Sequence, residues 1–126
     1  MINILVVLMG GAIGSLCRYW WSGLVAQRLG QNFPYGTLFV NLVGCLIIGL
    51  VAGLFSKLVP TSWEESVRLF LTVGICGGLT TFSSFSLQTL HLIANKQWGA
   101  ALVNILVSTI FCLGLVAAGW WVGQNI

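Results

Sequence analysis

A run of hydroxyl and phenyl side chains, TTFSSFS at residues 80–86, is the part of this sequence best suited to chemistry. If the run is helical, Phe82 and Phe85 project together because they are three residues apart. Thr81 and Ser84 then form a polar stripe beside them. Phenyl rings have positive edges and hydroxyls donate hydrogen bonds, so the run predicts a surface that stabilises a small anion without binding it tightly. The alternatives are that the rings only pack and that the hydroxyls bond back to their own helix.

Two further sets of polar residues recur at a spacing of four within apolar stretches. Thr37 and Asn41 share one helix face, and Asn104 and Ser108 share another. Asn donates through its amide and Ser through its hydroxyl. We therefore expect Thr37, Asn41 and Ser108 to lie along the same anion pathway.

Arg18 lies well inside the first apolar stretch, where a charge costs at least ~2.5 kcal/mol at the centre of a bilayer. It follows Gly14 by one helical turn, so it is expected to share the packed face. No carboxylate lies within the apolar stretches to neutralise it, because Glu64 and Glu65 are at the end of one. The arrangement favours an anion as the partner of Arg18. The alternative is a structural arginine that caps a helix or bonds to carbonyls.

The composition places these residues in an integral membrane protein. The chain of 126 residues is 58% hydrophobic and only 6% charged, and its mean hydropathy is +1.01. Soluble domains carry about a quarter charged residues. A net charge of +3 without a run of Lys or Arg argues against a nucleic-acid partner.

Other kinds of site are not indicated. The cysteines, Cys17, Cys45, Cys76 and Cys112, are far apart and inside apolar stretches, which favours small structural residues over a metal or disulfide site. No acid–base pair or nucleophile constellation is visible, so no enzyme is predicted. His91 is expected to be an interfacial residue.

Polar breaks divide the chain into stretches that are long enough to span a bilayer as helices. These stretches cover about residues 2–29, 34–57, 63–94 and 98–122. A helix-start signature precedes the third one: Pro60, then Thr61 or Ser62 as the cap, with acidic residues just beyond. The predicted fold is a single all-α membrane domain of four transmembrane helices. A β-barrel is excluded because period-two alternation is absent.

The third stretch is too long to be one straight span. Its length as a helix would be about 48 Å, against a hydrocarbon core of about 30 Å. Gly74, Gly77 and Gly78 are the expected place for a break in mid-membrane, because glycine is a poor helix former. Unwound backbone at that depth is tolerated where it is buried or lines a wet cavity. The alternative is that Gly74 and Gly78 form a packing face in an unbroken helix.

The cations are balanced across the membrane. With four spans, Lys57 and Arg68 lie on the side of the chain ends. Arg28 and Lys96 lie on the other side. Because the positive-inside rule then has no bias to act on, the chain can insert in both orientations, and an antiparallel dual-topology homodimer is predicted.

Small-residue faces are available for close packing in such a dimer. Gly10 with Gly14, and Gly49 with Gly53, have the spacing of the GxxxG motif. Dimerisation is also expected on grounds of size, because four short spans offer little room to enclose a pathway.

Three segments of the sequence closely resemble, in order and spacing, the signature segments of the Fluc (CrcB) family of bacterial fluoride channels. These segments are GGAIGSLCRYW, GTLFVNLVG and GICGGLTTFSSFS. The resemblance covers essentially the whole chain. It implies a dual-topology homodimer of four-span subunits with two parallel fluoride pathways and a structural Na+ buried at the dimer centre.

The resemblance also implies roles for individual residues. The backbone carbonyls of Gly77 and Thr80 would coordinate the Na+. The other implied positions belong to the pathway: Phe82 and Phe85 as its aromatic pair, Asn41 and Ser108 as polar donors, Ser83 and Ser84 as a hydroxyl track, and Arg18 in an aqueous vestibule.

The chain departs from the family pattern at three positions. Ser84 replaces a frequent Thr and keeps the hydroxyl, whereas Gln88 replaces a frequent Glu and removes a charge. Cys112 stands where some relatives have Ser, so we assign it no donor role.

We therefore expect passive export of fluoride down its electrochemical gradient across the bacterial inner membrane, which confers fluoride resistance. A small dual-topology multidrug or cation exporter is the main rival, but proton coupling requires a carboxylate within a span, and none is present. A structural membrane adaptor would need neither the polar stripes nor Arg18.

Overall fold

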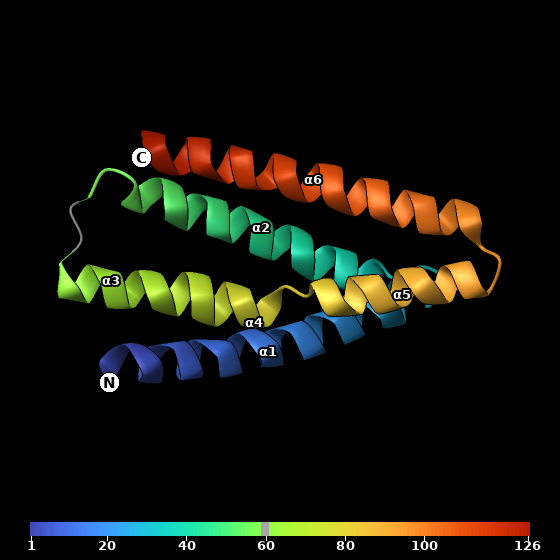
Figure 1. The fold of residues 1–126 in the computed structure, drawn as a ribbon, viewed down its shortest axis with the longest axis horizontal. Helices are drawn as coiled ribbons and strands as arrows, with labels where there is room; N and C mark the ends of the chain where they lie inside the picture. Colours follow the sequence, from blue (N-terminus) through green and yellow to red (C-terminus); the bar gives the residue numbers. More distant parts are fainter. Residues whose placement is uncertain (59–60) are drawn as a thin grey trace.

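The computed structural model describes residues 1–58 and 61–126, and this part of the chain is helical and contains no strand. Four helical stretches in it are long and apolar enough to cross a membrane. They are α1 (Ile2–Leu29), α2 (Tyr35–Phe55), the third stretch (Ser62–Ala94) and α6 (Trp98–Asn125). They run along one common direction, and both chain termini lie at the same end as the start of α3 (Figure 1). The predicted all-helical architecture with four candidate spans is confirmed.

The third stretch consists of four consecutive elements. These are α3 (Ser62–Leu69), the π-helical segment η1 (Phe70–Cys76), α4 (Gly77–Leu79) and α5 (Phe82–Ala94). Thr61 begins the stretch with a capping box, because its side chain accepts a hydrogen bond from the Glu64 N–H and its own N–H donates to the Glu64 carboxylate at 2.8 Å. Of the two predicted caps, Thr61 is therefore the one used. Pro60 lies outside the described residues.

The two residues between α4 and α5, Thr80 and Thr81, form what we call the interruption (Figure 1). Their backbone is extended, with φ −81° and ψ 155° at Thr80 and φ −153° and ψ 113° at Thr81. The expectation that the chain leaves the helix at Gly74, Gly77 and Gly78 is wrong in its position, since these three glycines lie in η1 and α4. The helix does not end at the glycines. It ends where threonine and asparagine side chains replace the lost main-chain hydrogen bonds.

The glycines of the third stretch instead permit close contact with α1. A Cβ atom on Gly74 would lie 2.8 Å from the Cα of Gly10. A Cβ atom on Gly78 would lie 2.6 Å from the carbonyl oxygen of Gly11 and 2.9 Å from the main-chain nitrogen of Ser15. A side chain cannot occupy these positions without moving a backbone. The alternative interpretation is therefore correct in one respect, because Gly74 and Gly78 do form a packing face.

The same kind of contact joins α2 to α6. Gly49 and Gly53 of α2 face the backbone of α6, and a Cβ atom on Gly119 of α6 would lie 2.5 Å from the carbonyl oxygen of Leu46. The glycine faces that the sequence offered to a dimer are thus buried between helices of one chain. Any contact with a second copy has to use another surface.

Candidate functional site

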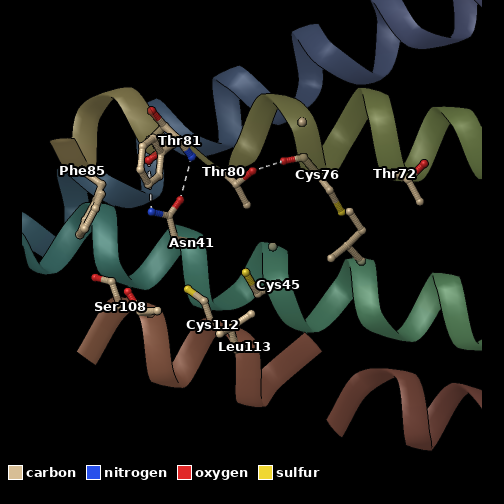
Figure 2. A pocket seen from close by; sticks show the side chains of 15 residues that line it. Asn41, Cys45, Thr72, Cys76, Thr80, Thr81, Phe85, Ser108, Cys112 and Leu113 are labelled. Atoms are coloured by element: carbon tan, nitrogen blue, oxygen red, sulfur yellow. Dashed lines mark hydrogen bonds between the residues drawn. The ribbon is translucent and has the colours of Figure 1, made fainter. Parts of the chain in front are cut away.

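A groove of about 450 Å³ lies between α2, α6 and the part of the third stretch around the interruption. Figure 2 shows side chains from these three segments converging on it. Among its lining residues are the predicted site residues Asn41, Gly77, Thr80, Phe82, Phe85 and Ser108. The other predicted pathway residues, Arg18, Thr37, Ser83 and Ser84, do not line it.

Asn41 of α2 holds the interruption in place. Its Oδ1 accepts a hydrogen bond from the Thr81 N–H at 2.7 Å, and its Nδ2 donates to the Thr81 carbonyl oxygen at 3.2 Å (Figure 2). Both main-chain groups of Thr81 therefore find a partner on α2, which satisfies polar backbone that has left the helix. We predicted Asn41 only as a donor along the pathway. The structure adds this second task, and one amide N–H of Asn41 remains for a ligand.

Thr81 in turn organises the start of α5. Its Oγ1 accepts from the Ser84 N–H at 3.1 Å, as a helix cap does, and donates to the Ser84 Oγ at 3.1 Å. The Ser83 Oγ lies 3.2 Å from the same oxygen. Ser83 and Ser84 thus form a hydroxyl cluster with Thr81, which itself lines the groove, whereas Ser86 bonds back to the Phe82 carbonyl of its own helix.

The two phenyl rings lie at the start of α5. The ring centroids of Phe82 and Phe85 are 5.4 Å apart and the rings are inclined at 41°. Phe82 is 78% exposed, although it lies next to the interruption, whereas Phe85 is partly buried. A phenyl ring that is exposed at the edge of the groove is available to a ligand or to another subunit.

A chain of buried hydrogen bonds connects Ser108 to Asn104 and Thr89. Ser108 is 7% exposed and Asn104 is 1% exposed. The Ser108 Oγ lies 3.4 Å from the Asn104 Oδ1, and the Asn104 Nδ2 donates to the Thr89 Oγ1 at 2.9 Å. Thr89 links α5 to α6 in this way and was missed from the sequence, because no periodic pattern relates it to Asn104.

Arg18 and Thr37 lie beside the groove. The Arg18 guanidinium is half-buried, and its Nη1 donates a long hydrogen bond of 3.4 Å to the Thr80 carbonyl oxygen. This contact corresponds to the carbonyl-bonded arginine that the sequence left open as an alternative. Thr37 is buried in the first turn of α2.

Three of the cysteines, which the sequence favours as small structural residues, line the groove. Cys45 comes from α2, Cys76 from η1 and Cys112 from α6 (Figure 2). All three are free thiols in the described part of the chain. They give the groove a soft, weakly polar wall opposite the hydroxyls of the interruption.

The main-chain carbonyls of Gly77 and Thr80 are among those that lack their usual helical partners at the interruption. In a continuous helix the Thr81 N–H would bond to the Gly77 carbonyl, and the Ser84 N–H would bond to the Thr80 carbonyl. Here these N–H groups bond to the Asn41 and Thr81 side chains instead. Oxygen donors of this kind are hard ligands and fit a small hard cation such as Na+. The contact from Arg18 leaves the Thr80 oxygen with one lone pair for this purpose.

Comparison with known proteins gives a consistent set of relatives. The family model described as "CrcB-like protein, Camphor Resistance (CrcB)" matches residues 5–120. A fluoride-specific ion channel FluC of Rhodospirillum rubrum is 47% identical over 126 residues, covering 95% of this chain and 90% of the relative. The FluC proteins of Nitrobacter winogradskyi and Methylocella silvestris are 46% and 41% identical, covering 92% and 95% of this chain and 90% and 88% of their own lengths.

Proposed function

The chain belongs to the CrcB family and is a multi-pass fluoride channel of a bacterial membrane, and we propose that fluoride crosses it passively through the groove beside the interruption. It is not an enzyme, because its relatives are ion channels. Export down the electrochemical gradient would lower cytoplasmic fluoride and so confer fluoride resistance.

The observation that carries this pathway is the set of side chains that meet in the groove. Phe82 and Phe85 contribute phenyl rings, the free N–H of Asn41 is a hydrogen-bond donor, and the Ser108 hydroxyl becomes a second donor if it turns from Asn104. Fluoride is small and strongly hydrated, so a pore has to replace its water with such contacts and still release it. We propose that Ser83 and Ser84 continue the pathway beyond the groove, and that Thr37 and Arg18 contribute at its polar edges.

Efflux from liposomes that contain the purified protein tests this function. We expect fluoride efflux well above that of protein-free vesicles, and chloride efflux close to that background. Equal rates for the two anions, or fluoride efflux at background, would contradict the proposal.

We further propose that the functional unit is an antiparallel homodimer and that the interruption lies at membrane depth. Phe82 and Gly77 are exposed on one subunit although they line the groove, so a second copy is needed to enclose this region. Lys57 and Arg68 lie towards one end of the helices, and Arg28 and Lys96 towards the other, which leaves no charge bias for orientation.

Two measurements test the dimer. Light scattering in detergent should give twice the chain mass of 13.6 kDa after correction for detergent. Introducing positively charged residues at one end of the helices only should enrich one orientation. Labelling of a terminal tag from each side of the membrane measures the two orientations. A monomeric mass, or labelling from one side only for the unaltered chain, would contradict it.

We also propose that Na+ is a structural ligand at the dimer centre, held by the carbonyl oxygens of Gly77 and Thr80 from both copies. Its charge would offset the partial negative charge of carbonyls that have no helical partner. We expect the thermal stability of the dimer in detergent to fall when Na+ is replaced by a large organic cation at equal ionic strength. Stability that is independent of Na+ would argue against this site.

A further inference from the structure

The groove does not end at the interruption. A second cavity of about 480 Å³ lies further along the third stretch, towards the start of α3. The two cavities share Ile48 and Thr72 among their lining residues, so they adjoin one another. Arg68 and Trp120 line the second cavity at its far end, close to the end of α2. The second cavity therefore places a cationic side chain, Arg68, next to the groove on the side of α3.

Arg68 differs from the cations near it. Lys57, at the same end of the molecule, donates through Nζ to the Gln124 carbonyl oxygen. Arg18 donates to the Thr80 carbonyl oxygen. The Arg68 side chain is exposed and is in no hydrogen bond found for the described residues, although its carbonyl accepts from the Thr72 hydroxyl at 2.8 Å.

The acidic residues of α3 do not neutralise Arg68 by direct contact. The Glu64 carboxylate accepts hydrogen bonds from the N–H and the hydroxyl of Thr61, which keeps it at the helix cap. Glu65 is exposed on the same helix. Neither Glu64 nor Glu65 is among the residues that line the cavity, whereas Arg68 is.

We propose that Arg68 forms an outer anion site at the mouth of the groove, where it attracts small monovalent anions, fluoride included, before they lose their water. This inference rests on the proposed function, since it assigns the entrance of the same pathway. A guanidinium at a partly enclosed mouth raises the local anion concentration and the rate of entry, and salt screens this effect. Arg68 thus raises the rate at which anions enter, and the groove determines which anion the channel selects.

Fluoride efflux from liposomes at low and high ionic strength, set with an impermeant salt at constant Na+, tests the outer site. We expect Arg68→Gln to lower efflux at subsaturating fluoride about threefold at low ionic strength, and this difference to vanish at high ionic strength. Arg68→Lys keeps the charge and should restore most of the rate. The selectivity for fluoride over chloride should be unchanged in both variants.

Lys57→Gln is the matched control, because it removes one positive charge from the same end of the molecule and therefore alters insertion bias equally. It should leave efflux unchanged at every ionic strength. Equal effects of Arg68→Gln and Lys57→Gln, a salt-independent loss, or failure of Arg68→Lys to restore efflux would each overturn the outer site while fluoride conduction itself stands. Absence of fluoride efflux from the unaltered protein would instead overturn the proposed function. Thermal unfolding in detergent checks that each variant is folded.

Discussion

The two halves of the third stretch are built for different tasks. Its first half, through η1 and α4, packs against the backbone of α1 at Gly74 and Gly78. Its second half, α5, begins with Phe82 exposed and with a hydroxyl cluster around Thr81. Only the interruption separates them (Figure 1). The first half leaves no space for a side chain at Gly74 and Gly78, whereas the second half begins with an exposed ring.

This difference shows how a small chain combines rigidity with an open polar site. Backbone contact through glycine holds η1 and α4 against α1, and one hydrogen bond from Ser66 to Asn3 joins α3 to the same helix. The interruption can then expose carbonyls and hydroxyls at a defined place, because Asn41 on α2 satisfies the main chain of Thr81. Substitutions at the glycine contacts of the first half should therefore affect folding, and substitutions after the interruption should affect conduction.

The largest effect is expected at Gly78. Gly78→Val places a side chain against the backbone of Gly11 and Ser15, which cannot yield without separating α1 from α4. We expect a loss of about 3 kcal/mol or more in stability, seen as little folded protein in detergent. Gly11→Ala is the control, since a Cβ atom there meets nothing within 4 Å. Normal yield of Gly78→Val would disprove the backbone contact.

Asn41→Ala should have the next largest effect. It leaves the N–H and the carbonyl of Thr81 without their partners on α2, at a cost of about 2 kcal/mol. We expect a lower unfolding temperature together with reduced fluoride efflux. Thr109→Ala removes a hydroxyl from the same groove with no bond to the interruption and should leave the unfolding temperature unchanged. A stability loss no greater than that of Thr109→Ala would show that Asn41 does not hold the interruption.

Phe82→Ala should reduce fluoride conduction with little effect on folding. Because the ring is 78% exposed on the subunit, its removal costs little packing within one chain. If the ring edge contacts the ion, fluoride efflux should fall at least about tenfold, which corresponds to about 1.4 kcal/mol. Phe111→Ala, which removes another exposed ring from α6, should leave efflux unchanged. Unaltered efflux in Phe82→Ala would remove this ring from the pathway.

The smallest effect is expected at the cap of α5. Thr81→Val keeps the shape but loses the oxygen that accepts from the Ser84 N–H, at a cost of about 1 kcal/mol. Thr81→Ser keeps the cap and should retain stability. Chemical or thermal unfolding of the two variants in detergent measures the difference, and equal stabilities would show that the cap contributes nothing.

Much of the candidate site was predictable because periodicity relates its residues within one helix. Phe82 and Phe85 are three residues apart, and their rings do lie together. Contacts between helices were not predictable in this way. The bonds from Asn41 to Thr81 and from Asn104 to Thr89 join segments whose relative rotation no single helix determines.

The sequence alone determined the class of protein, its helices and its family, because hydropathy, helical spacing and three signature segments are local properties of the chain. Tertiary structure decided where the third stretch leaves the helix and what the glycines do. Gly74 and Gly78 remain helical because α1 packs against them, and Thr80 and Thr81 are extended where Asn41 replaces the lost hydrogen bonds. The physical reason is that a backbone in an apolar environment leaves the helix only where another segment satisfies its polar groups.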